Sequence, residues 1–186
     1  MTLENLKNKI LALLDVTEAP SESALCAAID GVAKKVALYT KNIKKSATLT
    51  FTQEKGKAQA DLPEDFAAFG YIRGERGVFA REQFEIVSGK IRTCRLGAGG
   101  HELIYFAYPP NVSAETGGDT ELGFDDYTAH TVAYGVAMEL CISICPEDLT
   151  RYARLATEYD VRMANLLGAA RDAAGVANTF FAGSHF

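Results

Sequence analysis

Two stretches at the start of the chain carry apolar side chains at the spacing of one helix face. The first set is Leu3, Leu6, Ile10 and Leu13, and the second is Leu25, Ile29, Val32, Val36, Tyr39 and Ile43. Within each set the steps are mostly three or four residues, the period of an α-helix. Ser21 follows the break between the two sets and suits a helix N-cap. Residues 1 to about 45 are therefore predicted to form two helices.

The pattern then changes to that of short strands. Residues 48–52 alternate polar and apolar side chains, which is typical of a half-buried strand. After a turn at 54–57 comes a second short strand that ends near Leu62, and further short runs follow at 84–87, 90–92 and 103–108. Ser88-Gly89 is predicted to close a hairpin, and Pro63-Glu64-Asp65-Phe66 a tight helical turn. The strands are thus placed in an insertion at about residues 46–112.

Helical spacing returns near Asp125. The segment from Asp125 to Cys145 is apolar on nearly every side, which indicates a central, buried helix ended by Pro146. A last helix is predicted after it. Its apolar face is Tyr152, Leu155, Tyr159, Met163, Leu166 and Ala170. From Gly175 onward we find no helical period, so residues 175–186 are expected to form an extended tail.

These elements define one fold class, mainly α with a small β insertion. Four helices are expected to form the core of a single domain over residues 1–174. The β-strands lie between the second and third helices, and the tail follows at 175–186. A few short strands are marginal alone, so the insertion is expected to rest on the helices or on a neighbour.

Composition narrows the class of partner. The net charge is -5, whereas a free nucleic-acid-binding domain normally carries a basic excess. Nucleic acid is therefore a poor default partner. No apolar run reaches the roughly 18–20 residues needed to span a bilayer, and the start lacks a signal peptide. The protein is expected to be made in the cytoplasm without a membrane partner.

The residue types that carry chemistry are present but scattered. His101, His130 and His185 do not fall at the spacing of metal ligands, and the segment around Cys141 and Cys145 is apolar. The glycine turn at 97–100 lacks the Lys-Ser/Thr of a phosphate-binding loop. We therefore expect no catalytic residue, no cofactor and no metal. A small hydrolase or ligand-binding domain stays open as an alternative, with Glu64, Asp65 and His101 in a cleft.

Two surface features remain. One is the basic cluster Lys34, Lys35, Lys41, Lys44 and Lys45, which is either a solvated helix face or a face toward DNA. The other is three phenylalanines, Phe180, Phe181 and Phe186, in a tail expected to lack helical structure. Exposed aromatic side chains are unfavourable in water unless they dock. They are predicted to dock on a partner, with folding back on the chain's own core as the alternative.

Several strings, taken in order, resemble head–tail connector (adaptor) proteins of tailed bacteriophages. They are Leu62-Pro63-Glu64-Asp65-Phe66, Phe84-Glu85-Ile86, Gly89-Lys90-Ile91, the strand 103–110, the segment 127–135, and the tyrosines Tyr152 and Tyr159. The spacing of those tyrosines is seven residues, where the pattern has four. The resemblance covers about residues 60–167.

The resemblance implies a structural virion protein and not an enzyme. It implies a helical bundle with a β insertion, and a ring of about twelve subunits seated under the portal, at the head–tail interface. The portal and other tail or neck proteins would be its partners, and its C-terminal segment would contact the portal. DNA would only pass through the lumen of the ring. The alternatives are another neck role, head completion or tail completion, and the small hydrolase or ligand-binding domain.

Overall fold

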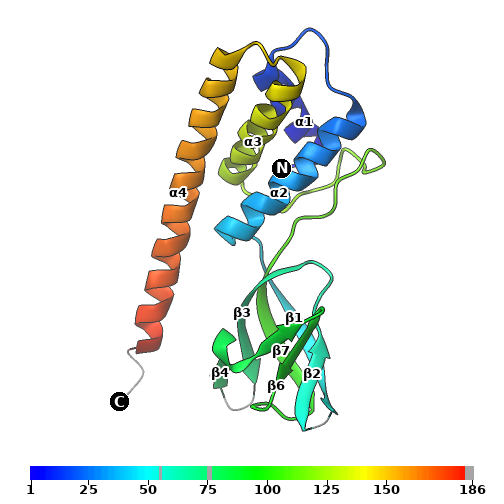
Figure 1. Ribbon diagram of the computed structural model, residues 1–186. Helices are drawn as coiled ribbons and strands as arrows, with labels where there is room; N and C mark the ends of the chain where they lie inside the picture. Colours follow the sequence, from blue (N-terminus) through cyan, green and yellow to red (C-terminus); the bar gives the residue numbers. More distant parts are fainter. Residues whose placement is uncertain (55, 75–76, 183–186) are drawn as a thin grey trace. The chain divides into compact units, whose positions relative to one another are not determined.

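The computed structural model describes residues 1–54, 56–74 and 77–182, with side chains as far as residue 170. The chain divides into two compact units (Figure 1). One unit joins residues 1–42 to the segment from residue 109 onward and is helical. The other is the segment 43–108, which holds the strands. Among the described residues, no helix is long and apolar enough to cross a membrane.

The helical unit contains four helices. They are α1 (Leu3–Leu14), α2 (Glu22–Thr40), α3 (Asp126–Ile144) and α4 (Leu149–Ala182). The first three begin at the N-caps Thr2, Ser21 and Asp125, whose side chains accept a hydrogen bond from a backbone N–H of the first turn. The helix expected from Asp125 to Cys145 is therefore confirmed as α3.

Helix α3 is the centre of this unit, because α1, α2 and α4 all pack on it. Its buried side chains lie on several sides of the helix and include Thr128, Val132, Val136 and Leu140. Gly135 marks the tightest approach. A Cβ atom there would lie 2.8 Å from both the Tyr159 ring on α4 and Val32 on α2. The glycine therefore lets two helices reach α3 at the same level.

The strand-bearing unit is one antiparallel sheet of seven strands, curled into a half-barrel. The strands are β1 (Lys44–Glu54), β2 (Lys57–Asp61), β3 (Phe66–Gly74), β4 (Gly77–Phe79), β5 (Glu85–Val87), β6 (Lys90–Thr93) and β7 (Gly99–Ala107). A short 3-10 helix, η1 (Arg81–Gln83), precedes β5. The order is β4-β3-β7-β1-β2-β6-β5.

The expected fold class, mainly α with a small β insertion, is wrong. Helix makes up 45% of the chain, and the seven strands form a compact unit of their own, so the sheet is a second major part of the fold. The largest omission was β3, since no element was predicted for residues 67–74. The tight turn predicted at residues 63–66 is present, because the Phe66 N–H donates to the Pro63 carbonyl at 3.0 Å. Pairing of β3 with β7 shifts register between Phe66 and Ala68 and again between Phe69 and Tyr71. These irregularities interrupt the alternation that identifies a strand from sequence.

The end of α2 differs from the prediction. The helix stops at Thr40, and Lys41 adopts a left-handed conformation (φ 52°) as its C-cap. Lys44 and Lys45 belong to β1 instead. The basic cluster predicted on one helix is therefore divided: Lys34 pairs with Asp30 on α2, and Lys45 pairs with Asp65 in the sheet unit.

The C-terminal segment also differs, because α4 continues to Ala182. The extended tail expected from Gly175 is thus wrong for residues 175–182. Alanines conceal the helical period in the sequence. The apolar positions 155, 159, 163, 166, 170, 173, 177 and 180 follow one another at steps of three and four residues.

The close packing at Gly135 gives a test of the helical core. We expect Gly135→Ala to lower the free energy of unfolding by about 1–2 kcal/mol, since the added methyl group meets Tyr159 and Val32. Gly31→Ala is the control. Gly31 lies in α2, is exposed, and has nothing within 4 Å of a Cβ, so the same change should raise stability by about 0.5–1 kcal/mol. Urea unfolding followed by far-UV circular dichroism measures both. Equal shifts of the same sign would contradict the packing.

Candidate functional site

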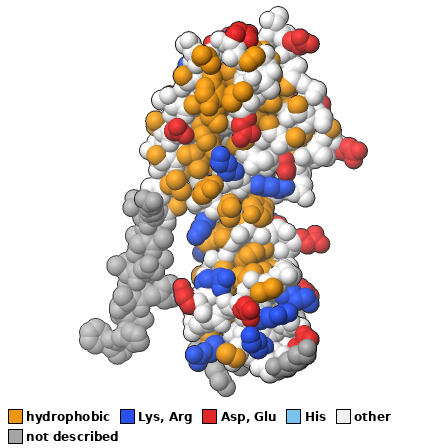
Figure 2. All heavy atoms as spheres, viewed as in Figure 1, with side chains coloured by type: hydrophobic (Ala, Val, Ile, Leu, Met, Phe, Trp, Pro, Cys, Tyr) orange, Lys and Arg blue, Asp and Glu red, His pale blue; other side chains and the backbone are white. Residues whose placement is uncertain are grey.

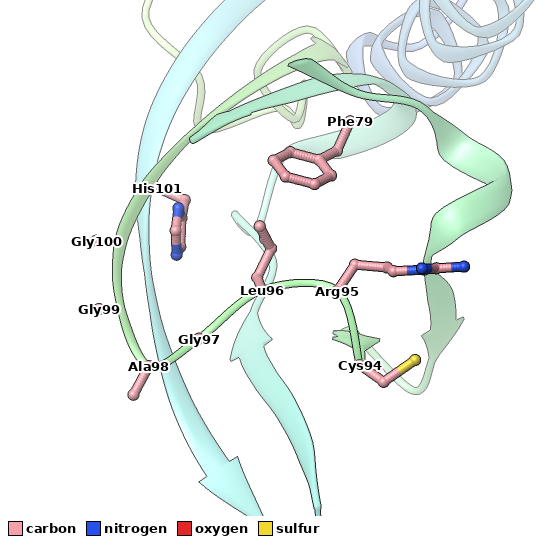
Figure 3. Close-up of a pocket in the computed structure, with 9 residues that line it drawn as sticks. All are labelled: Phe79, Cys94, Arg95, Leu96, Gly97, Ala98, Gly99, Gly100 and His101. Carbon is pink, nitrogen blue, oxygen red and sulfur yellow. The ribbon is translucent and has the colours of Figure 1, made fainter. Parts of the chain in front are cut away.

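A hollow of about 440 Å³ lies beside the start of β7 in the sheet unit (Figure 3). Phe79 of β4 lines it, together with residues 94–98 and the first three residues of β7. The glycine turn expected at residues 97–100 therefore forms one wall of this hollow. Gly99 has φ +133°, a conformation that favours glycine.

His101 points into this hollow (Figure 3). Its ring stands edge-on to Phe51, with 5.5 Å between ring centroids. A Cβ atom at Gly74 would lie 3.0 Å from its Nδ1 atom, so Gly74 makes room for the ring. Both ring nitrogens are buried and have no hydrogen-bond partner among the described residues. A bound group that both donates and accepts a hydrogen bond would satisfy a neutral imidazole there.

Asp65 has its own partners in the sheet unit. Its carboxylate accepts hydrogen bonds from Tyr105 Oη at 2.8 Å and from Lys45 Nζ at 2.6 Å. Burial acts to raise the pKa of Asp65, but these two bonds outweigh it and hold that pKa below its usual value. Burial, with the bond to Asp65, raises the pKa of Tyr105 to about 12. Asp65 thus ties the β2–β3 connection to β1 and β7.

Glu64, Asp65 and His101, expected in one cleft if the chain were a small hydrolase or ligand-binding domain, do not lie together. The backbone N–H of Tyr108 donates to the Asp65 carbonyl at 2.7 Å, which places Asp65 at the far end of β7 from His101. At about 3.3 Å per residue, His101 lies roughly 23 Å away along the strand. Glu64 is exposed on the same turn as Asp65. The three residues therefore cannot act on one small substrate.

The cysteines are free thiols. Cys26 and Cys141 are buried, and burial raises the pKa of each thiol. Cys145 is half-buried and Cys94 is exposed beside the hollow. In the part of the chain that the structure describes, no three His, Cys, Asp or Glu side chains are grouped as they would have to be to hold a metal ion.

The predicted docking residues fall at the C-terminal end. Phe180 and Phe181 lie in the last turns of α4, where the backbone is described but side chains are not. Phe186 lies outside the described residues. Whether these phenylalanines dock on a partner stays a prediction.

Helix α4 is attached to α3 along only part of its length. Leu155 and Tyr159 are buried, and the Arg162 guanidinium lies over the rings of Tyr134 and Tyr127, 4.7 and 5.7 Å from their centroids. Asn165 Nδ2 donates to Tyr127 Oη at 3.1 Å. Tyr127 is the second residue of α3, so Asn165 marks the level at which α3 begins. Residues 166–182 of α4 continue past it, for about 25 Å.

Several large apolar side chains of the helical unit are exposed. Figure 2 shows hydrophobic side chains gathered on the visible face of this unit. Among the described residues of this unit, and irrespective of the face on which they lie, the most exposed large apolar side chains are Tyr39 (57%), Ile142 (56%), Leu149 (72%) and Val161 (55%). The helical spacing had predicted that Tyr39 lies on the core face of α2, so its exposure was not expected. An apolar surface of this kind is typical of a contact with another protein.

No protein-family model and no curated protein matches the chain.

The Asp65 contacts predict a pH dependence. A carboxyl whose folded pKa is lowered stabilises the fold above its unfolded pKa of about 3.9, and that contribution is lost as pH falls through the folded pKa. We expect Asp65→Asn to lower stability by about 1 kcal/mol at pH 7, a value reduced for partial exposure. The difference from the wild type should shrink toward pH 3. Glu64→Gln, at the exposed neighbouring carboxyl, should change little at either pH. A deficit for Asp65→Asn that is equal at both pH values would contradict this role.

Proposed function

We propose that the chain is a structural virion subunit, a head–tail connector (adaptor) that assembles into a ring and docks on the portal of a tailed phage. The ordered strings from Leu62-Pro63-Glu64-Asp65-Phe66 to Tyr159 support this by their resemblance to that family. The fold class expected from the resemblance was wrong. The proposal therefore depends mainly on how α4 is placed in the helical unit.

The observation that carries it is the length of α4 beyond α3. About 25 Å of α4 lies past the start of α3, the helix on which α4 mainly packs. A helical segment without such packing is only marginally stable, since most helical stability in proteins comes from tertiary contacts. The sequence nevertheless keeps apolar positions 166, 170, 173, 177 and 180 on one side of it. Such a stripe fits an α4 extension, residues 166–182, that packs on another protein chain.

A ring requires two different complementary surfaces on each subunit, because a head-to-tail contact repeats around the circle. The α4 extension would supply one of them, and a subunit that cannot join the ring would bind the portal singly and therefore more weakly. Exposed apolar side chains of the helical unit, Tyr39 and Val161 among them, would supply apolar surface for the other.

Two substitutions in α4 test the proposal. Leu166 lies on the apolar stripe and is half-buried, while Ala164 is exposed and lies on the opposite side from Leu155. We expect Leu166→Glu to weaken binding to the purified portal ring encoded with this chain by at least about tenfold. Ala164→Glu adds the same charge two residues away and should bind as the wild type does.

The melting temperature of each variant separates loss of docking from loss of fold. We expect both variants to melt within a few degrees of the wild type. Portal binding by Leu166→Glu that equals the wild type would contradict the role of the α4 extension. A wild-type chain that does not bind the portal would contradict the connector proposal and leave the other neck roles, head or tail completion.

A further inference from the structure

Strand β1 pairs with a different neighbour along each part of its length. Residues 44–51 pair with β7, and residues 52–54 pair with β2 on the opposite side. Strand β2 then leaves β1 and pairs with β6. Among the described residues, the side of β1 that faces away from β7 therefore has no strand partner from Lys44 to Phe51.

The register fixes which backbone groups lie on that open side. The Ala107 N–H donates to the Ile43 carbonyl at 2.8 Å, so Ile43 and Ala107 form a hydrogen-bonded pair. Alternation then directs the backbone groups of residues 45, 47, 49 and 51 toward β7. The N–H and C=O groups of Lys44, Ser46, Thr48 and Thr50 point the other way. The hairpin pairs Thr52–Gln59 and Glu54–Lys57 agree with this assignment.

The open side is accessible. Lys44, Ser46, Thr48 and Thr50 are all exposed, while Leu49 on the inner face is 5% exposed. The two strands at the ends of the sheet, β4 and β5, are only three residues long. Short edge strands are a common protection against unwanted pairing, and the open side of β1 is longer than either. Strand β3 also pairs with β4 over only part of its length, but its residues there are half-buried, and Phe69 packs on Phe84.

Charge indicates what kind of segment fits. Residues 44–53 contain two lysines, Lys44 and Lys45, and no carboxylate. Lys45 already pairs with Asp65, so Lys44 is the one whose charge has no ion pair among the described residues. Both lysines lie at one end of the open side. In an antiparallel arrangement, the C-terminal end of an added strand lies opposite them.

We propose that this edge of β1, Lys44 to Thr50, is a docking site for an extended segment of a partner protein. The segment adds an antiparallel strand, with acidic residues at its C-terminal end opposite Lys44 and Lys45. The four free N–H and C=O pairs would supply main-chain hydrogen bonds, as in other strand additions to a sheet edge. This site lies in the sheet unit and does not depend on the α4 extension, so either can fail without the other.

A labelled peptide provides the probe. We choose the heptapeptide Thr-Val-Thr-Val-Thr-Glu-Glu, and as its control Thr-Val-Thr-Val-Thr-Lys-Lys. Fluorescence anisotropy with the full chain should show the acidic peptide binding at least about tenfold more tightly than the lysine peptide. Equal binding of the two peptides, or no binding of the acidic one up to about 1 mM, would overturn the proposal.

Two substitutions at one position test the main-chain contact. Thr48→Pro removes a backbone N–H on the open side, where proline is tolerated because no ladder bond is lost. Thr48→Val keeps that N–H and the branched side chain. We expect Thr48→Pro to lose about tenfold or more in affinity for the acidic peptide, and Thr48→Val to stay near the wild type. Equal affinities of the two variants would overturn the proposal.

A measurement on the wild type covers the case in which Thr48→Pro does not fold. Titration with the acidic peptide should shift the amide NMR signals of Lys44, Ser46, Thr48 and Thr50 most strongly. Shifts concentrated at the hollow beside His101, or spread evenly over the sheet, would place the peptide elsewhere and contradict the edge site.

Discussion

The fold of the helical unit depends on one constraint: α3 is apolar on nearly all sides and has to be covered on all of them. Helices α1 and α2 come before it in the chain and α4 after it, so the cover is assembled from both ends of the sequence. Gly135 lets Val32 and Tyr159 reach the helix together. The sheet unit can stand between α2 and α3 in the chain because its own first and last residues lie side by side. The Ala107 N–H donates to the Ile43 carbonyl there.

The same constraint explains the shape of α4. Among the described side chains of α4, those that are fully buried or hydrogen-bonded to other helices lie between Arg151 and Asn165. The described side chains that carry charge in the sheet unit mostly pair with one another, as Lys45 does with Asp65 and Arg73 with Glu102. The surfaces left open are an apolar one on the helices and a backbone edge on β1. On this account both serve contacts with other chains.

Sequence reasoning found the parts of the fold in which one signal was strong. Helix α3 was predicted correctly because Asp125 caps it, Pro146 follows it, and its apolar residues surround it. Strand β3 was missed because two register shifts break its alternation and Gly70 brings its backbone against the Ile104 carbonyl. The end of α4 was mistaken for a tail because alanines at 170, 173 and 177 are weak markers of a helix face.

The surfaces were harder to predict than the elements. Periodicity assigns a side chain to one face of a helix, but it does not show whether that face is covered, and Tyr39 was placed in the core for this reason. The open side of β1 has no signal in its own sequence. It arises because β2 pairs with β1 for three residues and then turns to β6, which is a property of the sheet as a whole. His101 was recognised as a candidate, but its distance from Asp65 follows only from the register of β7 with its neighbours.

The central claim is that this chain functions as a subunit of an assembly. Sedimentation velocity of the purified full chain, over a range from about 1 to 100 µM, tests it most directly. We expect oligomers several times heavier than the 20.1 kDa chain, whose population grows as the protein concentration rises. A single 20.1 kDa monomer across the whole range, unchanged when the purified portal ring is added, would contradict it.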